Sequence, residues 1–292
     1  MKVVSTPRAA TIGCRFATHE LAMQNKKRIA LSIDISCPLR HHIDVYNGAH
    51  AKLSESKWNS FHDPYFNPLK PSAPDVVGII GRANRRQVRR AQRAGVPLVN
   101  VMHNTPAFGT VPSVIPDYAE AGRLAARHLI SRGFRQFGLL GYQRDRSQTD
   151  MNEGFLTALH EEGQQCRHKL HIPWGSDEHA DSWHLFQQNV RRWIGTWDRP
   201  IGVFVNRDVL AMYLINFCKE EGISVPGDAG VVCTESCPYM CTSRTPTISS
   251  IDVAFTQVGE EAAQLLGRML SSGRLRKRPI LVRPAGWVPR QA

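Results

Sequence analysis

The sequence has 292 residues, of which 42% are hydrophobic, and it carries a formal net charge of +12 at pH 7. This length and composition allow one large or two medium domains with proper cores and exclude a fibrous or disordered chain. No apolar stretch approaches the ~20 residues that span a bilayer, and the start lacks the apolar core of a signal peptide. We therefore expect a soluble, cytoplasmic protein with no membrane partner, whose positive charge favours contact with polyanions.

In the first half of the chain, short apolar runs alternate with amphipathic segments. Residues 1–27 are expected to form only a tail. Pro116 marks the start of one helix, and Gly95 and Gly133 mark helix ends. We predict strands at 28–34, 58–61, 75–81, 96–102 and 134–141, and helices at 40–54, 83–95 and 116–133.

The alternation begins again after Gly141. We predict helices at 149–163, 180–196, 207–222 and 254–273, and strands at 168–173, 201–206, 229–234 and 247–252, with a last strand near the end of the chain. Strands separated by helices imply right-handed crossovers and parallel sheets covered on both faces. The predicted fold class is therefore α/β, with two doubly wound parallel-sheet lobes and a crevice between them.

Five motifs recur in register with one known family. They are the run from Asp117 to Gly122 with His128, Leu129 and Gly133; the Gly154-Phe155 pair; Asp208; GISVPGD at 222–228; and TPTISSIDVAFTQVGEEAAQLL at 245–266. Over about residues 28 to 290 the chain resembles the ligand-binding core of LacI/GalR-type repressors, a periplasmic-binding-protein-like fold. The resemblance implies three hinge crossings, a first lobe of 28–141 plus 248–273, and a second lobe of 142–247 plus 274–292.

Within that family the chain looks most like the sensor half of xylose operon regulators. The similar residues are Ile29 to Asp34, Arg40, and the segments VFVNRD and GVVCTESCP. Those regulators continue into an AraC-type DNA-binding module, and the present sequence ends at Ala292. The resemblance thus implies a homodimer that reaches DNA only through a module outside this chain or through a partner.

Ligands of open α/β sheets bind outside the carboxyl ends of the strands, so polar residues at those ends are candidates. Asp, Asn, Arg and Glu side chains suit sugar hydroxyls, which need rigidly held donors and acceptors. For Asp208 the alternative is a helix N-cap, and for Glu235 it is a solvated loop carboxylate. With Arg40 added from the resemblance, the predicted ligand-binding residues are Asp34, Arg40, Arg82, Asn104, Arg144, Asn206, Arg207, Asp208 and Glu235.

One position departs from the family pattern. The family often carries an arginine three residues before the Gly-Phe pair, where this chain has Met151. Arg144, Arg146 or Arg207 could supply that charge from nearby, because a guanidinium fork can approach from another direction. The departure puts xylose itself in doubt as the ligand.

Other groups of cysteine and histidine residues do not predict a metal site or a catalytic site. Cys233, Cys237 and Cys241 lack the usual metal-ligand spacing, and adjacent histidines such as His41 and His42 point to different faces. No nucleophile elbow, phosphate loop or dinucleotide fingerprint occurs. We therefore expect no catalytic residues, no metal and no cofactor. The arginine run between 82 and 93 suits either phosphate contact or, as the preferred interpretation, a solvated outer helix face.

These patterns favour a sensor that closes on a small carbohydrate, with a xylose-like pentose as the first candidate, and controls DNA binding by population shift. A solute-binding protein for a sugar transporter is the alternative, because it has the same fold and the same closure. An enzyme on this scaffold is a third class, and it would require turnover of a bound ligand.

Overall fold

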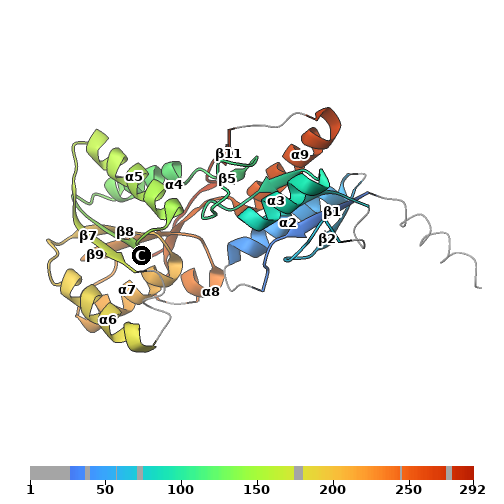
Figure 1. Cartoon of the computed structure of the whole chain (residues 1–292). Coiled ribbons are helices and arrows are strands. Elements are labelled where there is room, and N and C mark those ends of the chain that lie inside the picture. The colour runs from blue at the N-terminus through green and yellow to red at the C-terminus, as the bar shows by residue number, and fades with distance from the viewer. Residues whose placement is uncertain are drawn as a thin grey trace, which may run out of the picture.

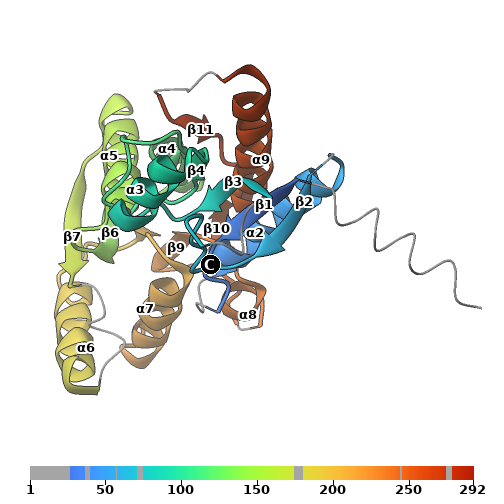
Figure 2. The ribbon, with the colours of Figure 1, turned by 45° about the vertical axis from the view of Figure 1, so that its right-hand side comes forward.

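The computed structural model describes residues 27–36, 40–56, 58–70, 75–173, 180–243, 245–273 and 278–292. The expected tail lies outside these residues, except for Lys27. Within the described residues, no helix is both long enough and apolar enough to cross a membrane. The chain forms two bodies that lie side by side, here called the first and second lobes (Figures 1 and 2).

The first lobe contains a parallel sheet of order β2-β1-β3-β4. Its strands are β1 (Arg28–Ser32), β2 (Asn59–His62), β3 (Val76–Gly81) and β4 (Leu98–Asn100). A parallel pair of β5 (Val114–Pro116) and β11 (Ile280–Val282) continues beside β4 through a bridge from Asn100 to Ser113. The helices of this lobe are α2 (Arg40–Ser54), α3 (Arg85–Ala94) and α9 (Phe255–Ser272).

The second lobe contains a six-stranded sheet of order β12-β10-β9-β8-β6-β7, in which only β12 runs antiparallel to its neighbour. Its strands are β6 (Gln136–Tyr142), β7 (Cys166–Ile172), β8 (Ile201–Val205), β9 (Ala229–Thr234), β10 (Ser249–Asp252) and β12 (Gly286–Val288). Its helices are α4 (Tyr118–Ser131), α5 (Arg146–Glu161), α6 (Ala180–Ile194), α7 (Asp208–Glu220) and the single turn α8 (Pro238–Cys241).

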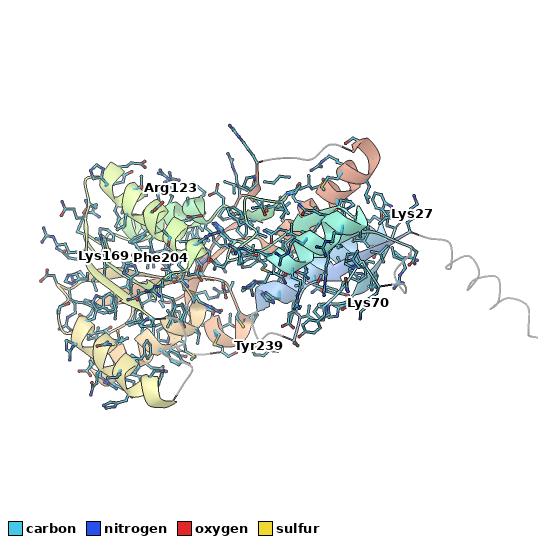
Figure 3. The ribbon with its side chains drawn as sticks, viewed as in Figure 1. Lys27, Lys70, Arg123, Lys169, Phe204 and Tyr239 are labelled. Carbon is cyan, nitrogen blue, oxygen red and sulfur yellow. The ribbon has the colours of Figure 1, made fainter. Side chains whose placement is uncertain are left out.

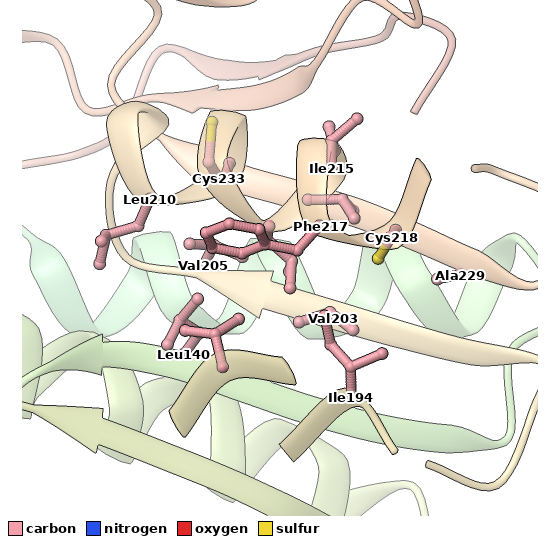
Figure 4. Packing of buried hydrophobic residues seen from close by; sticks show 14 of the residues in the cluster. Leu140, Ile194, Val203, Val205, Leu210, Ile215, Phe217, Cys218, Ala229 and Cys233 are labelled. Atoms are coloured by element: carbon pink, nitrogen blue, oxygen red, sulfur yellow. The ribbon is translucent and has the colours of Figure 1, made fainter. Parts of the chain in front are cut away.

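Both sheets are covered on both faces, because alternate residues of each strand point to opposite sides. In β8, Val203 and Val205 pack with α6 and α7, as Figure 4 shows, whereas Phe204 packs against α4 and α5. In the first lobe, Ile80 of β3 faces α2 and α9, and Ile79 faces α3. The predicted class, two doubly wound parallel-sheet lobes, is therefore confirmed. Figure 3 shows the labelled side chains distributed over both lobes, with Tyr239 on α8 near their junction.

The chain crosses between the lobes three times, as the resemblance implied, but at other places. The crossings lie between β5 and α4, between β10 and α9, and between β11 and β12. The expected boundaries need correction because β6 and β10 pair within the second sheet and α4 packs on α5. Residues 118–141 and 249–252, which were expected in the first lobe, thus lie in the second, and β11 lies in the first.

Most predicted elements lie within a few residues of the observed ones, and the helix ends show why. Asn84 and Gln87 form a capping box at the start of α3, and Gly95 adopts the left-handed conformation after its end. Asp117 caps α4 by accepting a hydrogen bond from the Glu120 amide. The three-residue strands β5, β11 and β12 and the turn α8 carry too little pattern to be predicted individually.

Candidate ligand-binding site

A cleft of about 890 Å³ lies between the lobes. Its walls are formed by the segments that follow β3, β4, β6, β8 and β9, which are the carboxyl ends of parallel strands in both sheets. Ligands bind at this edge of open α/β sheets, so the cleft is the first candidate for a ligand site.

The structure brings six of the nine predicted site residues to this cleft. Those that line it are Arg82, Asn104, Arg144, Asn206, Arg207 and Glu235. Asp34 instead accepts hydrogen bonds from the backbone and hydroxyl of Ser36. Arg40 lines a neighbouring cavity of about 570 Å³ and pairs with Asp44 at 3.3 Å.

Asp208 lies behind the cleft wall rather than on it. It is the first residue of α7 and only 5% exposed. Its carboxylate accepts the backbone N–H groups of Val209 at 2.8 Å and Cys237 at 3.2 Å. The role visible here is neither the expected sugar contact nor an N-cap, since Arg207 occupies the N-cap position. Asp208 ties the loop after β9 to the start of α7.

Glu235 forms the polar centre of the second-lobe wall. Its carboxylate lies 3.9 Å from the Arg207 guanidinium and 3.7 Å from Nδ1 of His41, which comes from the first lobe. Burial raises the pKa of Glu235 to about 7, although Arg207 opposes the shift. Burial, together with neighbouring His42 and Arg207, lowers the pKa of His41 to about 3. His41 is therefore neutral near pH 7, and its contact with Glu235 is not an ion pair.

We expect the Glu235→Gln variant to lose less stability than the native protein as pH rises. The folded-state pKa of Glu235 lies above its ordinary value of 4.5, so the folded state binds the proton more tightly than the unfolded state. As pH rises from about 4.5 to about 7, ionisation of this carboxyl group therefore lowers the free energy of unfolding of the native protein. Urea unfolding at about pH 5 and pH 8 should show the pH-dependent loss reduced by about 1–3 kcal/mol in the variant.

The matched control is Glu162→Gln, which changes an exposed carboxylate at the end of α5 that forms no ion pair with any described residue. It should follow the native pH profile. Parallel profiles for Glu235→Gln and the native protein would show that Glu235 titrates normally.

Asn104 connects the two lobes across the mouth of the cleft. Its amide nitrogen donates to Asp145 Oδ1 at 2.7 Å, and its amide oxygen accepts the backbone N–H of Arg146 at 2.9 Å. Two weaker contacts lie beside it: Arg146 Nη1 to the Thr105 carbonyl at 3.4 Å, and His103 Nδ1 to Asp150 at 3.5 Å. The contacts between the lobes at the cleft mouth are thus few and polar.

Sequence reasoning missed two aromatic residues of the cleft lining, Tyr118 and Phe255. Phe255 stacks on the His41 ring at 4.9 Å, and Tyr118 stacks on His103 at 5.6 Å between ring centroids. Tyr118 and Phe255 each follow a crossing between the lobes, and only the tertiary arrangement turns those positions toward a common cleft. Rings of this kind can pack against the apolar faces of a ligand. Met151, at the family's usual arginine position, also lines the cleft.

Strained backbone gathers at the same place. Among the described residues other than glycine, those with positive φ are Arg144 (60°), Glu235 (65°) and Ala254 (61°). The first two line the cleft, and Ala254 precedes the lining residue Phe255. The left-handed conformation is unfavourable for residues with a side chain, and such strain clusters at functional sites.

The described residues show no group of three or more His, Cys, Asp or Glu side chains placed to hold a metal ion. The described cysteines are free thiols, and Cys233 and Cys241 are buried. Cys14 and Cys37 lie outside the described residues.

In α3, Ala91 is buried and most of the arginines are exposed, which fits the outer-face interpretation, but Arg85 lines the cleft.

Two doubly wound lobes, three crossings and a polar cleft at the strand ends define the class of two-lobed binding folds. Residues 126–292 match the family of periplasmic binding protein-like domains, and the chain belongs to that family. The resemblance inferred from the motifs is thereby confirmed. The match covers the second lobe from the end of α4 onward, together with α9 and β11 of the first lobe.

Several transcription regulators are similar to the chain. The xylose operon regulatory proteins of Haemophilus influenzae and Escherichia coli K12 are 23% and 22% identical over 81% and 84% of this chain. The HTH-type transcriptional repressor PurR of Yersinia pestis is 30% identical over 60% of it. The aligned regions cover 62%, 64% and 50% of these relatives, so the chain spans less than two thirds of their length.

Solved structures show the same fold. The transcriptional regulator CelR in complex with cellobiose superposes with a TM-score of 0.71 at 17% identity, covering 97% of this chain and 91% of that one. The xylose-binding transcription activator xylR gives 0.73 at 21% identity, covering 90% and 68%. A LacI family regulator from Enterococcus faecium with bound ribose gives 0.69 at 18% identity, covering 90% and 97%.

Proposed function

We propose that the chain is the ligand-binding part of a transcription regulator and that it senses a small carbohydrate. The observation that carries this proposal is the cleft between the lobes, whose walls come from the strand ends of both sheets. The similar regulators described with xylose, cellobiose and ribose support a carbohydrate as the ligand class. A xylose-like pentose is the first candidate, and the nine predicted residues, with the six in the cleft foremost, are its proposed contacts.

Binding would act by population shift. A ligand that touches both walls binds the closed arrangement more tightly than the open one and so favours closure. A coupling of ~1–3 kcal/mol between closure and DNA affinity is enough for a several-fold to hundredfold change in DNA occupancy. DNA contact would come from a module outside this chain or from a partner, and the protein would work as a homodimer in the cytoplasm.

A thermal-shift screen of the purified chain against pentoses, hexoses and their derivatives tests the proposal. A ligand that binds only the folded state raises the melting temperature by mass action. A selective, saturable shift with one carbohydrate supports a sensor. Turnover of that carbohydrate on incubation would favour the enzyme class instead, and the absence of any shift would contradict carbohydrate sensing.

The Asn104→Ala variant should bind that carbohydrate about 3- to 10-fold more weakly, because truncating Asn104 removes three hydrogen bonds between the lobes that favour the closed arrangement. Small-angle scattering of the unliganded variant should show a larger radius of gyration. Asn47→Ala, an exposed position on α2 away from the cleft, is the control and should match the native protein. Unchanged affinity and shape in Asn104→Ala would contradict the role of this residue in closure.

A further inference from the structure

The cleft lining carries far more positive than negative charge. Five arginines line it against two carboxylates. Arg82 and Arg85 belong to the first lobe, at the end of β3 and the start of α3. The second lobe contributes the other three, which are Arg144, Arg146 and Arg207. Guanidinium groups stay protonated at all physiological pH values, so this charge is permanent.

Little of that charge is neutralised within the protein. Only Arg207 lies within 4.0 Å of a described carboxylate, that of Glu235. Arg82 and Arg146 donate to the neutral backbone carbonyls of Asn104 and Thr105. For Arg85 and Arg144, the described part of the chain provides neither a hydrogen bond nor an ion pair. Among the described residues, four of the five guanidinium groups therefore have no carboxylate within 4.0 Å.

The two carboxylates in the lining are already engaged. Asp145 accepts from the Gln148 backbone, the Ser147 hydroxyl and the Asn104 amide at the start of α5. Glu235 faces Arg207 and His41. The side-chain oxygen of Gln148 accepts the Tyr142 backbone N–H at 2.6 Å. A neutral sugar needs acceptors for its hydroxyl protons as well as donors. Asn206 Oδ1 is a free acceptor in this lining, but the five arginines give the lining many more donors than acceptors.

We infer that the ligand is an anionic carbohydrate, a sugar bearing a phosphate or carboxylate group that the cleft arginines of both lobes bind together. This inference rests on the proposed carbohydrate function and narrows its ligand class. Phosphate and carboxylate oxygens accept the paired N–H groups of a guanidinium with strong, directional hydrogen bonds. The rings of Tyr118 and Phe255 also line the cleft and can pack against the apolar face of the sugar.

The same charge arrangement explains how such a ligand would close the cleft. Arginines on opposite walls repel each other, and the repulsion grows as the walls approach in a medium less polar than water. An anion placed between them turns this repulsion into attraction on both sides. Its affinity for the closed arrangement therefore exceeds its affinity for the open one, which is the condition for a population shift.

The test is calorimetric titration of the full chain with matched pairs: ribose and ribose 5-phosphate, glucose and glucose 6-phosphate, and glucose and glucuronate. We expect an anionic member of at least one pair to bind at least ~10-fold more tightly than its neutral partner, with affinity falling as salt rises. A phosphate ester and a carboxylate that differ in affinity would tell the two sources of charge apart. Inorganic phosphate and sulfate are titrated alone as probes of the charge by itself.

Arginine variants test whether the tighter binding of the anionic sugar depends on the cleft. The double variant Arg82→Gln with Arg144→Gln removes one exposed charge from each wall and keeps amide donors in place. It should bind the anionic sugar at least ~10-fold more weakly. Arg89→Gln removes one positive charge from an exposed position of α3 outside the cleft lining, and this variant should bind as the native protein does. Melting temperatures of the three proteins should agree, which separates binding from folding.

The outcomes distinguish the inference from the function on which it rests. Equal or tighter binding of the neutral sugar would overturn the inference and leave carbohydrate sensing supported. The inference would also be wrong if inorganic phosphate bound as tightly as the sugar phosphate, or if Arg89→Gln weakened binding as much as the double variant. Binding of none of the sugars, neutral or anionic, would contradict the proposed function itself.

Discussion

Replacing Gly154 by alanine is expected to destabilise the protein by about 3 kcal/mol, because α4 and α5 cross with their backbones in contact. A Cβ at Gly154 would overlap the carbonyl oxygen of Ala119, and a Cβ at Gly122 would overlap that of Met151. Both obstacles are helix backbone, which cannot rotate aside as a side chain could. The two helices would have to separate, and the packing of Ala121, Phe155 and their neighbours beneath them would loosen.

The first lobe repeats this arrangement and offers a parallel test. Gly48 of α2 and Gly259 of α9 meet in the same way, against the backbone of Thr256 and Val45. Gly259→Ala should therefore cause a similar loss. Urea denaturation measures both losses, with Gly195→Ala as the control because its Cβ would come no nearer than 3.4 Å to the Arg192 carbonyl. Full stability in Gly154→Ala would show that the helices are not packed this closely.

Replacing Asp208 by alanine should cost about 2–3 kcal/mol of stability, because the change leaves two backbone donors without their acceptor. The carboxylate is almost fully buried and holds the N–H groups of Val209 and Cys237. Cys237 is the N-cap residue of the turn α8 and lies two residues after Glu235. Losing this anchor should also loosen the loop that presents Glu235 to the cleft and so weaken ligand binding.

Asp208→Asn separates these effects. The amide oxygen of the asparagine can accept one of the two hydrogen bonds. Burial also raises the pKa of Asp208, so a neutral side chain of the same shape should cost less stability than truncation to alanine. We expect chemical denaturation to rank the proteins as native, then Asn, then Ala. If Asp208→Ala folds as stably as the native protein but no longer binds ligand, Asp208 contacts the ligand directly, as first expected from the sequence.

The sequence was a good guide to the individual helices and strands, because these elements are set by local pattern. The strand at 201–206 is apolar throughout, as a strand buried on both faces must be, and the structure places β8 there with alternate residues facing different helix pairs. The helix at 40–54 was predicted with its observed bounds. Asn84, Gly95 and Asp117 stand where helix caps require them.

The cleft was predictable in part for the same reason. The rule that ligands bind at the carboxyl ends of strands needs only strand positions, and it selected Arg82, Asn104 and Asn206 correctly as cleft residues. It also selected Asp34 and Asp208, because the end of a strand does not determine where the next side chain points. The Asp208 carboxylate points away from the cleft and accepts the backbone N–H of Cys237. The Asp34 carboxylate accepts the backbone N–H of Ser36, two residues further along the chain.

By itself, then, the sequence determined the class of fold, the alternation of strands and helices, the helix ends and the general edge where a ligand would bind, because each depends on residues close together in the chain. Only the tertiary structure decided the lobe to which α4, β6 and β10 belong, since strand pairing and the crossing of Gly122 with Gly154 join distant segments. The tertiary structure also brought Tyr118 and Phe255 to one cleft and placed arginines from both lobes around it, with fewer carboxylates than arginines. Neither arrangement could be predicted from the sequence, because burial and charge balance are properties of the folded molecule.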